Sequence, residues 1–129
     1  MGPYPSRENA PDYILEAIRL GFDVEVDAWY QDGWSLGHDA PTHKVDAKLL
    51  NSPRLWVHCK NYPALEKALE SKLHCFYHTN EDYVLTSRQY IWAFPGMPGG
   101  ERTICVLPDQ GRDVSGFYGV CTDYAARFR

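Results

Sequence analysis

Residues 22–29 alternate between apolar and acidic side chains in the order Phe-Asp-Val-Glu-Val-Asp-Ala-Trp. Because successive side chains of a strand point to opposite faces, this pattern predicts a strand with one apolar face and one acidic face. On a surface strand the acidic face would simply be solvated, and that interpretation stays open. A helical stretch that ends at Gly21 precedes the strand, and strands fed by helices are usually parallel, with a covered apolar face. The acidic face then looks into a barrel or cleft, where crowded carboxylates need a cation such as a divalent metal ion.

The length and charge of the chain restrict its class. Its 129 residues predict one domain, 1–129, well short of the roughly 250 residues of a complete eight-fold α/β barrel. A net charge of -4 gives no basic surface for a nucleic acid. No apolar run approaches the ~18 residues of a membrane span, and residues 1–7 do not resemble a signal segment. We therefore expect a cytoplasmic protein with no membrane span and no nucleic-acid partner.

The four cysteines lie in apolar, strand-like runs and lack the CxxC spacing of zinc or redox sites; they are Cys59, Cys75, Cys105 and Cys121. This placement favours buried thiols over disulfides.

Further elements follow from periodicity and from turn residues. Helices are expected at 10–20 and 62–72, with a helical turn near 45–50. Strands are expected at 22–29, 55–60, 73–78, 89–94, 102–107 and 118–121, with a small hairpin strand at 34–37. The alternation of helix and strand as far as residue 78 predicts parallel pairing with right-handed crossovers.

Five segments together resemble one enzyme family: residues 9–21, Val-Glu-Val-Asp at 24–27, Leu-Gly-His-Asp-Ala-Pro at 36–41, the strand that ends in Lys60, and Gly-Val-Cys-Thr-Asp-Tyr at 119–124. In order and spacing they are similar to the glycerophosphodiester phosphodiesterases of the phosphatidylinositol-phospholipase-C-like superfamily. The resemblance implies a trimmed, incomplete TIM-type α/β barrel of about six mostly parallel strands, with few helices and a small hairpin. It also implies a metal-dependent hydrolase whose site lies at the C-terminal ends of the strands.

The resemblance assigns roles to four residues. Glu25 and Asp27 match the two metal-binding acids of the family, His38 matches a general acid or base, and Lys60 matches a lysine near the phosphate. The chemistry is coherent, because a hard divalent ion polarises phosphoryl oxygens and an imidazole can protonate a departing alkoxide. Two alternatives stay open: His38 as a surface loop residue, and Lys60 as a structural ion-pair partner of the acids.

The chain departs from the family pattern at two places. Residues 1–8 contain no counterpart of the first-strand His-Arg-Gly, which supplies a second catalytic histidine and an arginine. His58 stands where the family has a third metal-binding acid. Imidazole is neutral and softer than carboxylate, so we expect Mg²⁺ or Ca²⁺ to bind more weakly, and a transition metal becomes a second candidate. His78 shares a strand face with His74 and is expected either to replace the missing catalytic histidine or to be a core or rim residue.

Three hypotheses result. The first is a metal-dependent phosphodiester hydrolase acting on a small phosphodiester, with the carboxylates, His38 and Lys60 converging on one polar pocket. The second is a non-catalytic, degenerate barrel that binds a phosphorylated ligand or a partner chain. The third is a homo-oligomer that forms through the exposed edges of strands 22–29 and 118–121.

Overall fold

The computed structural model describes residues 4–129, which form two compact units, 4–77 and 78–129. The first unit contains, in chain order, η1 (Pro5–Arg7), α1 (Pro11–Arg19), β1 (Val24–Tyr30), β2 (Trp34–Leu36), β3 (His43–Lys44), α2 (Ala47–Leu50), β4 (Leu55–Cys59), α3 (Tyr62–Glu70) and β5 (Cys75–Phe76). The second unit contains β6 (Tyr83–Leu85), β7 (Ile91–Ala93), β8 (Thr103–Val106), β9 (Gly119–Cys121) and η2 (Ala125–Phe128).

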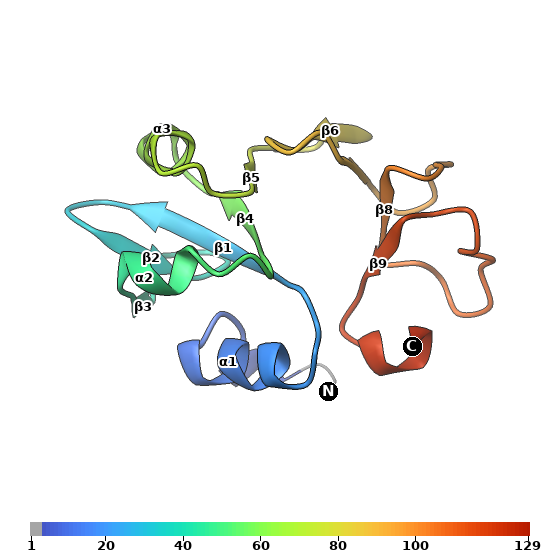
Figure 1. Cartoon of the computed structure of the whole chain (residues 1–129), viewed down its shortest axis with the longest axis horizontal. Coiled ribbons are helices and arrows are strands. Elements are labelled where there is room, and N and C mark those ends of the chain that lie inside the picture. Colours follow the sequence, from blue (N-terminus) through green and yellow to red (C-terminus); the bar gives the residue numbers. More distant parts are fainter. Residues whose placement is uncertain (1–3) are drawn as a thin grey trace. The chain divides into compact units, whose positions relative to one another are not determined.

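The first unit is built on a five-stranded mixed sheet of order β3-β2-β1-β4-β5 (Figure 1). β1 pairs parallel with β4 and antiparallel with β2, and β4 pairs parallel with β5. β1 is therefore an inner strand with a neighbour on each side. All five residues of β4 are buried, as expected for a parallel strand that is covered on both faces.

The apolar side of this sheet forms the core of the first unit. Val26, Ala28 and Val57 are almost completely buried, and α3 packs against β1, β4 and β5. α3 faces the sheet with Ala64 and Ala68, both fully buried, and these small side chains allow the helix to lie close to the strands. The alternation of residues 22–29 thus places the apolar set where the sequence predicted it.

Asn61 fixes the junction between strand and helix. Its side-chain oxygen accepts a hydrogen bond from the amide of Ala64 and caps α3. The same oxygen accepts from the amide of Tyr30, and the side-chain nitrogen donates to the carbonyl of Tyr30. One side chain therefore caps α3 and also forms hydrogen bonds with the backbone amide and carbonyl of the last residue of β1.

The second unit is a four-stranded mixed sheet of order β6-β7-β8-β9, in which only the pairing of β6 with β7 is antiparallel. The parallel strands are joined by the loops 94–102 and 107–118 instead of by helices. Gly99 lies where no side chain fits, because a Cβ there would lie 2.5 Å from Cγ2 of Thr103 and 2.6 Å from the Phe117 ring.

The predicted trimmed TIM-type barrel is wrong. The structure contains two mixed sheets and three α-helices, and neither sheet closes into a barrel within residues 4–129. Two physical causes account for the error. The hairpin strand β2 occupies the side of β1 where a barrel needs a parallel neighbour. β5 is only two residues long, so the parallel ladder ends there, and β6 pairs with β7 within another sheet.

The predicted exposed edge at residues 22–29 is also wrong, because β1 lies between β2 and β4. The expected strand at 118–121 is present as β9, and it does lie at the edge of its sheet. Both helices, the strands and the hairpin are found close to their predicted positions, but the short strands β3 and β6 were not predicted. The four cysteines form no disulfide, as predicted, and only Cys121 is not fully buried.

Candidate metal and phosphate site

The acidic face of β1 meets a histidine and a lysine from β4 and its C-terminal end. Glu25 and Asp27 are two residues apart on β1 and therefore share one face. The parallel register places His58 directly opposite Asp27. Lys60 follows β4 and shares the face of His58 by the same period of two, and its amide donates to the carbonyl of Ala28. The face predicted to be acidic therefore carries both acidic and basic side chains, and we call Glu25, Asp27, His58 and Lys60 the cluster.

The polar atoms of this cluster are close together. Nδ1 of His58 lies 2.9 Å from Oδ1 of Asp27 and 3.7 Å from Oε1 of Glu25. Nζ of Lys60 lies 3.9 Å from the same oxygen of Asp27. One donor atom from each of Glu25, Asp27 and His58 lies within 4.8 Å of the others. Four of the six predicted site residues are therefore brought together.

The cluster is partly shielded from solvent. The side chain of Asp27 is 6 % exposed and that of His58 10 % exposed, whereas Glu25 is 26 % and Lys60 19 % exposed. The His58 ring stacks on Phe76 of β5, with the ring centres 5.2 Å apart and the planes almost parallel. Phe76 therefore restricts the orientation of the imidazole, while Glu25 and Lys60 form the more accessible side.

Burial and charge act differently on the two acids. Burial, reinforced by the nearby charge of Asp27, raises the pKa of Glu25 well above its ordinary value of 4.5, and Lys60 offsets only part of this rise. Burial would also raise the pKa of Asp27, but hydrogen bonds from His58 and Asn9 outweigh it, and the pKa of Asp27 falls. Two carboxylates on one face thus differ in character: Asp27 is held ionised, and Glu25 takes up a proton readily.

Asn9 contacts the cluster and was missed as a site residue. Its side-chain nitrogen donates to Oδ2 of Asp27 at 3.0 Å, and its oxygen accepts from the amide of Asp27 at 2.8 Å. Ala10 is the N-cap residue of α1, and both side-chain bonds of Asn9 go to Asp27 of β1. Asn9 has a left-handed backbone, which Asn tolerates, but this conformation is visible only in the structure and no sequence pattern indicates the role of Asn9.

His38 lies on the loop after β2, and its side chain is not part of the cluster of Glu25, Asp27 and His58. The side chain is 60 % exposed, and Nδ1 lies 2.9 Å from a carboxylate oxygen of Asp39. The loop itself is anchored to β1, because the amide of Gly37 donates to the carbonyl of Asp27. The indole of Trp29 donates to the carbonyl of Gly37. The returning hairpin therefore brings the backbone just before His38 alongside Asp27 in the middle of β1, and the imidazole is mostly in solvent.

The last predicted site residue, His78, begins the second unit. Its ring packs edge-on against Phe94, with the ring centres 4.6 Å apart. We therefore interpret His78 as a packing residue of the second unit.

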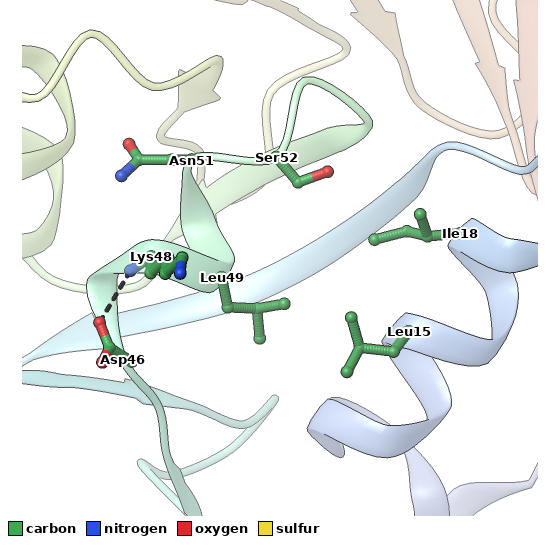
Figure 2. Close-up of a pocket in the computed structure, with 7 residues that line it drawn as sticks. All are labelled: Leu15, Ile18, Asp46, Lys48, Leu49, Asn51 and Ser52. Atoms are coloured by element: carbon green, nitrogen blue, oxygen red, sulfur yellow. Dashed lines mark hydrogen bonds between the residues drawn. The ribbon is translucent and has the colours of Figure 1, made fainter.

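A separate hollow lies between α1 and α2 (Figure 2). Leu15 and Ile18 of α1 point toward Leu49 of α2, and the rest of the lining comes from α2 and the residues that flank it. The amide of Lys48 donates to the side chain of Asp46, which caps this short helix. The hollow is mainly apolar, and none of its lining residues belongs to the cluster. We therefore look for metal and phosphate binding at the cluster and not at the hollow.

The donor set of the cluster suits a divalent metal ion. Carboxylate oxygens serve Mg²⁺, Ca²⁺ and Mn²⁺, whereas an imidazole nitrogen favours Zn²⁺ and other first-row transition metals. Asp27 only accepts hydrogen bonds when ionised, so Nδ1 of His58 donates to it, and that proton has to leave before Nδ1 can bind metal. Glu25, Asp27 and His58 therefore fit a metal in composition and spacing, with mixed oxygen and nitrogen ligands.

Comparison with protein-family models, curated proteins and solved structures gives no match for this chain. The family resemblance rests on the quoted residues alone, and the functional argument rests on the geometry of the cluster. In residues 4–129, no helix has both the length and the apolar character needed to cross a membrane.

Proposed function

We propose that the chain binds a divalent metal ion through Glu25, Asp27 and His58 and hydrolyses a small phosphodiester beside it. The observation that carries the proposal is the convergence of these three donors within 4.8 Å, next to the ammonium group of Lys60. Clusters of two acids, an imidazole and a lysine suit a metal together with an anionic ligand, because the acids hold the cation and the lysine faces the anion.

Each side chain has a distinct role in this proposal. Asp27 is the constant anionic ligand, since hydrogen bonds keep it ionised. Glu25 carries a raised pKa, so it releases its proton when a cation binds. Lys60 is 19 % exposed and neutralises one charge of a phosphate that approaches the open side of the cluster. When bound, the metal supplies Lewis-acid stabilisation of charge on the phosphoryl oxygens.

The proton for the leaving group comes from His38 in this scheme. Its loop is attached to Asp27 and Trp29 of β1 through Gly37, so His38 directly follows a residue that is bonded to the backbone of Asp27. The side chain faces solvent beside Asp39, and a bound phosphodiester would have to draw it inward.

A second candidate function is binding of a phosphorylated ligand without turnover. The solvent-facing side chain of His38 favours this candidate, because a general acid has to reach the leaving group and this imidazole lies outside the cluster. In this alternative Lys60 and the metal ligands hold the phosphate, and the His38 loop takes no part.

Calorimetric titration with MnCl₂, ZnCl₂, MgCl₂ and CaCl₂, followed by assays on a panel of glycerophosphodiesters, separates the candidates. Metal-dependent turnover that is lost in both Glu25→Ala and His38→Ala supports the hydrolase. Phosphate-ester binding with no turnover in the wild type supports the second candidate. A wild-type chain that binds none of the four metals refutes the metal-dependent hydrolase.

A further inference from the structure

Asn9 and Asn61 hold the same strand in the same manner at two different places. Asn9 bonds the amide and the carboxylate of Asp27, and Asn61 bonds the amide and the carbonyl of Tyr30. Each side chain thus donates once to β1 and accepts once from it. They differ in what the donated bond fixes: Asn61 fixes backbone, whereas Asn9 fixes one oxygen of a side chain in the cluster.

We propose that Asn9 is a positioning residue for the metal site. Asn9 binds one carboxylate oxygen of Asp27 and thereby leaves the other oxygen for the metal. This inference rests on the proposed metal binding. Oδ2 of Asp27 receives the Asn9 amide group at 3.0 Å. Oδ1 is the oxygen that lies near Nδ1 of His58 and Nζ of Lys60. One oxygen is therefore held by the scaffold, and the other is directed at the cationic side of the cluster.

The surroundings of Asn9 support a fixed geometry. Asn9 is 9 % exposed and has a backbone φ of 60°, a conformation that Asn adopts more easily than most residues. The second bond, from the amide of Asp27, prevents the Asn9 side chain from rotating away. Asp27 therefore binds a metal through Oδ1 alone, and its carboxylate is oriented before the metal arrives.

Groups that orient a metal ligand in this way influence metal affinity strongly. Loss of such a hydrogen-bonding partner typically weakens metal binding about 10- to 100-fold. A purely structural role for Asn9 would lower the stability of the fold and leave the affinity of the folded protein unchanged. Metal affinity measured on folded protein distinguishes the two roles.

The test compares Asn9→Gly with Asn61→Ala. Glycine accepts the positive φ of position 9, so this variant removes the side chain without backbone strain. Asn61→Ala removes the two bonds to the backbone of Tyr30, together with the cap of α3, and none of these bonds involves a side chain of the cluster. MnCl₂ and ZnCl₂ are titrated calorimetrically into each protein, and urea unfolding in EDTA measures stability in parallel.

We expect both variants to lose stability, and only Asn9→Gly to bind metal about 10- to 100-fold more weakly. Wild-type affinity in a folded Asn9→Gly, or an equal loss in both variants, overturns the positioning role. If Asn9→Gly does not fold, Asn9→Ser, whose side chain is too short to reach both groups on Asp27, gives the same comparison. A wild type without metal binding refutes the proposed function, and this inference fails with it.

Discussion

Glu25 is a partly buried acid beside another acid, and removing its charge should stabilise the metal-free protein. The perturbation is Glu25→Gln, which keeps the size of the side chain and resembles the protonated acid. Donor atoms of Glu25 and Asp27 lie within 4.8 Å, and two unit charges at that separation repel by about 3.5 kcal/mol at an effective dielectric constant of about 20. Lys60 attracts Glu25 and offsets part of this repulsion. We expect Glu25→Gln to raise the free energy of unfolding by about 1 to 2 kcal/mol at neutral pH in EDTA.

The same effect has a pH dependence with a defined sign. The folded protein holds a proton on Glu25 more tightly than the unfolded chain does, because burial raises the pKa above 4.5. The stabilisation by protonated Glu25 is fully present below the ordinary pKa and is lost as the pH rises through the raised pKa. Asp27 has a lowered pKa, so its contribution is lost only in more acidic solution. Wild-type stability in EDTA should therefore fall from about pH 5 upward, and Glu25→Gln should lack this component.

Urea unfolding followed by tryptophan fluorescence at pH 5 to 8 measures both effects. Glu101→Gln, at an exposed carboxylate of the second unit, is the matched control and should change stability by less than about 0.5 kcal/mol. Metal at 100 times its Kd should add about 2.7 kcal/mol to the wild type and much less to Glu25→Gln. A Glu25→Gln protein that is less stable than wild type in EDTA, or that keeps the wild-type pH slope, refutes the assigned electrostatics.

Three further predictions concern Lys60, Asn61 and Gly99. Lys60→Met should weaken binding of inorganic phosphate about 10-fold and tighten metal binding slightly, since the ammonium group competes for Asp27; equal phosphate affinity by calorimetry contradicts this. Asn61→Ala should cost about 1 to 3 kcal/mol in urea unfolding, and an unchanged midpoint would show that its bonds are dispensable. Gly99→Ala should cost about 1 to 3 kcal/mol through overpacking, whereas Gly100→Ala, which meets nothing within 4 Å, should be nearly neutral; equal midpoints contradict the assigned packing.

The local elements were predictable because their causes are local. Pro11 at the start of α1 and Gly21 just after it delimit the first helix, and the alternation of 22–29 assigns each side chain of β1 to a face. Asn61 followed by Pro63 marks the start of α3 in the same way. These signals act within a few residues, so the sequence carries them directly.

The sheet topology was not predictable from such signals. β3 and β6 have two and three residues, and pairing with a neighbour defines them more than their own composition does. Asp32-Gly33 between apolar runs indicates a hairpin turn, but the pattern does not reveal that β2 pairs with the edge of β1 opposite to β4. The barrel that the family resemblance implied needs mostly parallel neighbours, and the antiparallel pairings of β2 and β6 belong instead to two separate mixed sheets.

The candidate site was likewise predictable only in part. Glu25 and Asp27 share a face by strand parity, and the parallel register with β4 adds His58 and Lys60 to it. The bond from Asn9 to Asp27 joins residues 18 positions apart, so no local pattern indicates it. The orientation of His38 toward solvent likewise depends on the loop after Gly37 and not on the motif that contains it.

Calorimetric titration of Mn²⁺ into the wild type and into Asp27→Asn tests the central claim most directly, because Asp27 contacts His58, Lys60 and Asn9 at once. Asparagine keeps the shape of the side chain and removes the charge that holds the cation. We predict one ion per wild-type chain and at least about 100-fold weaker binding in the folded variant. Equal binding by both proteins, or none by the wild type, would contradict a metal site on this face of the sheet.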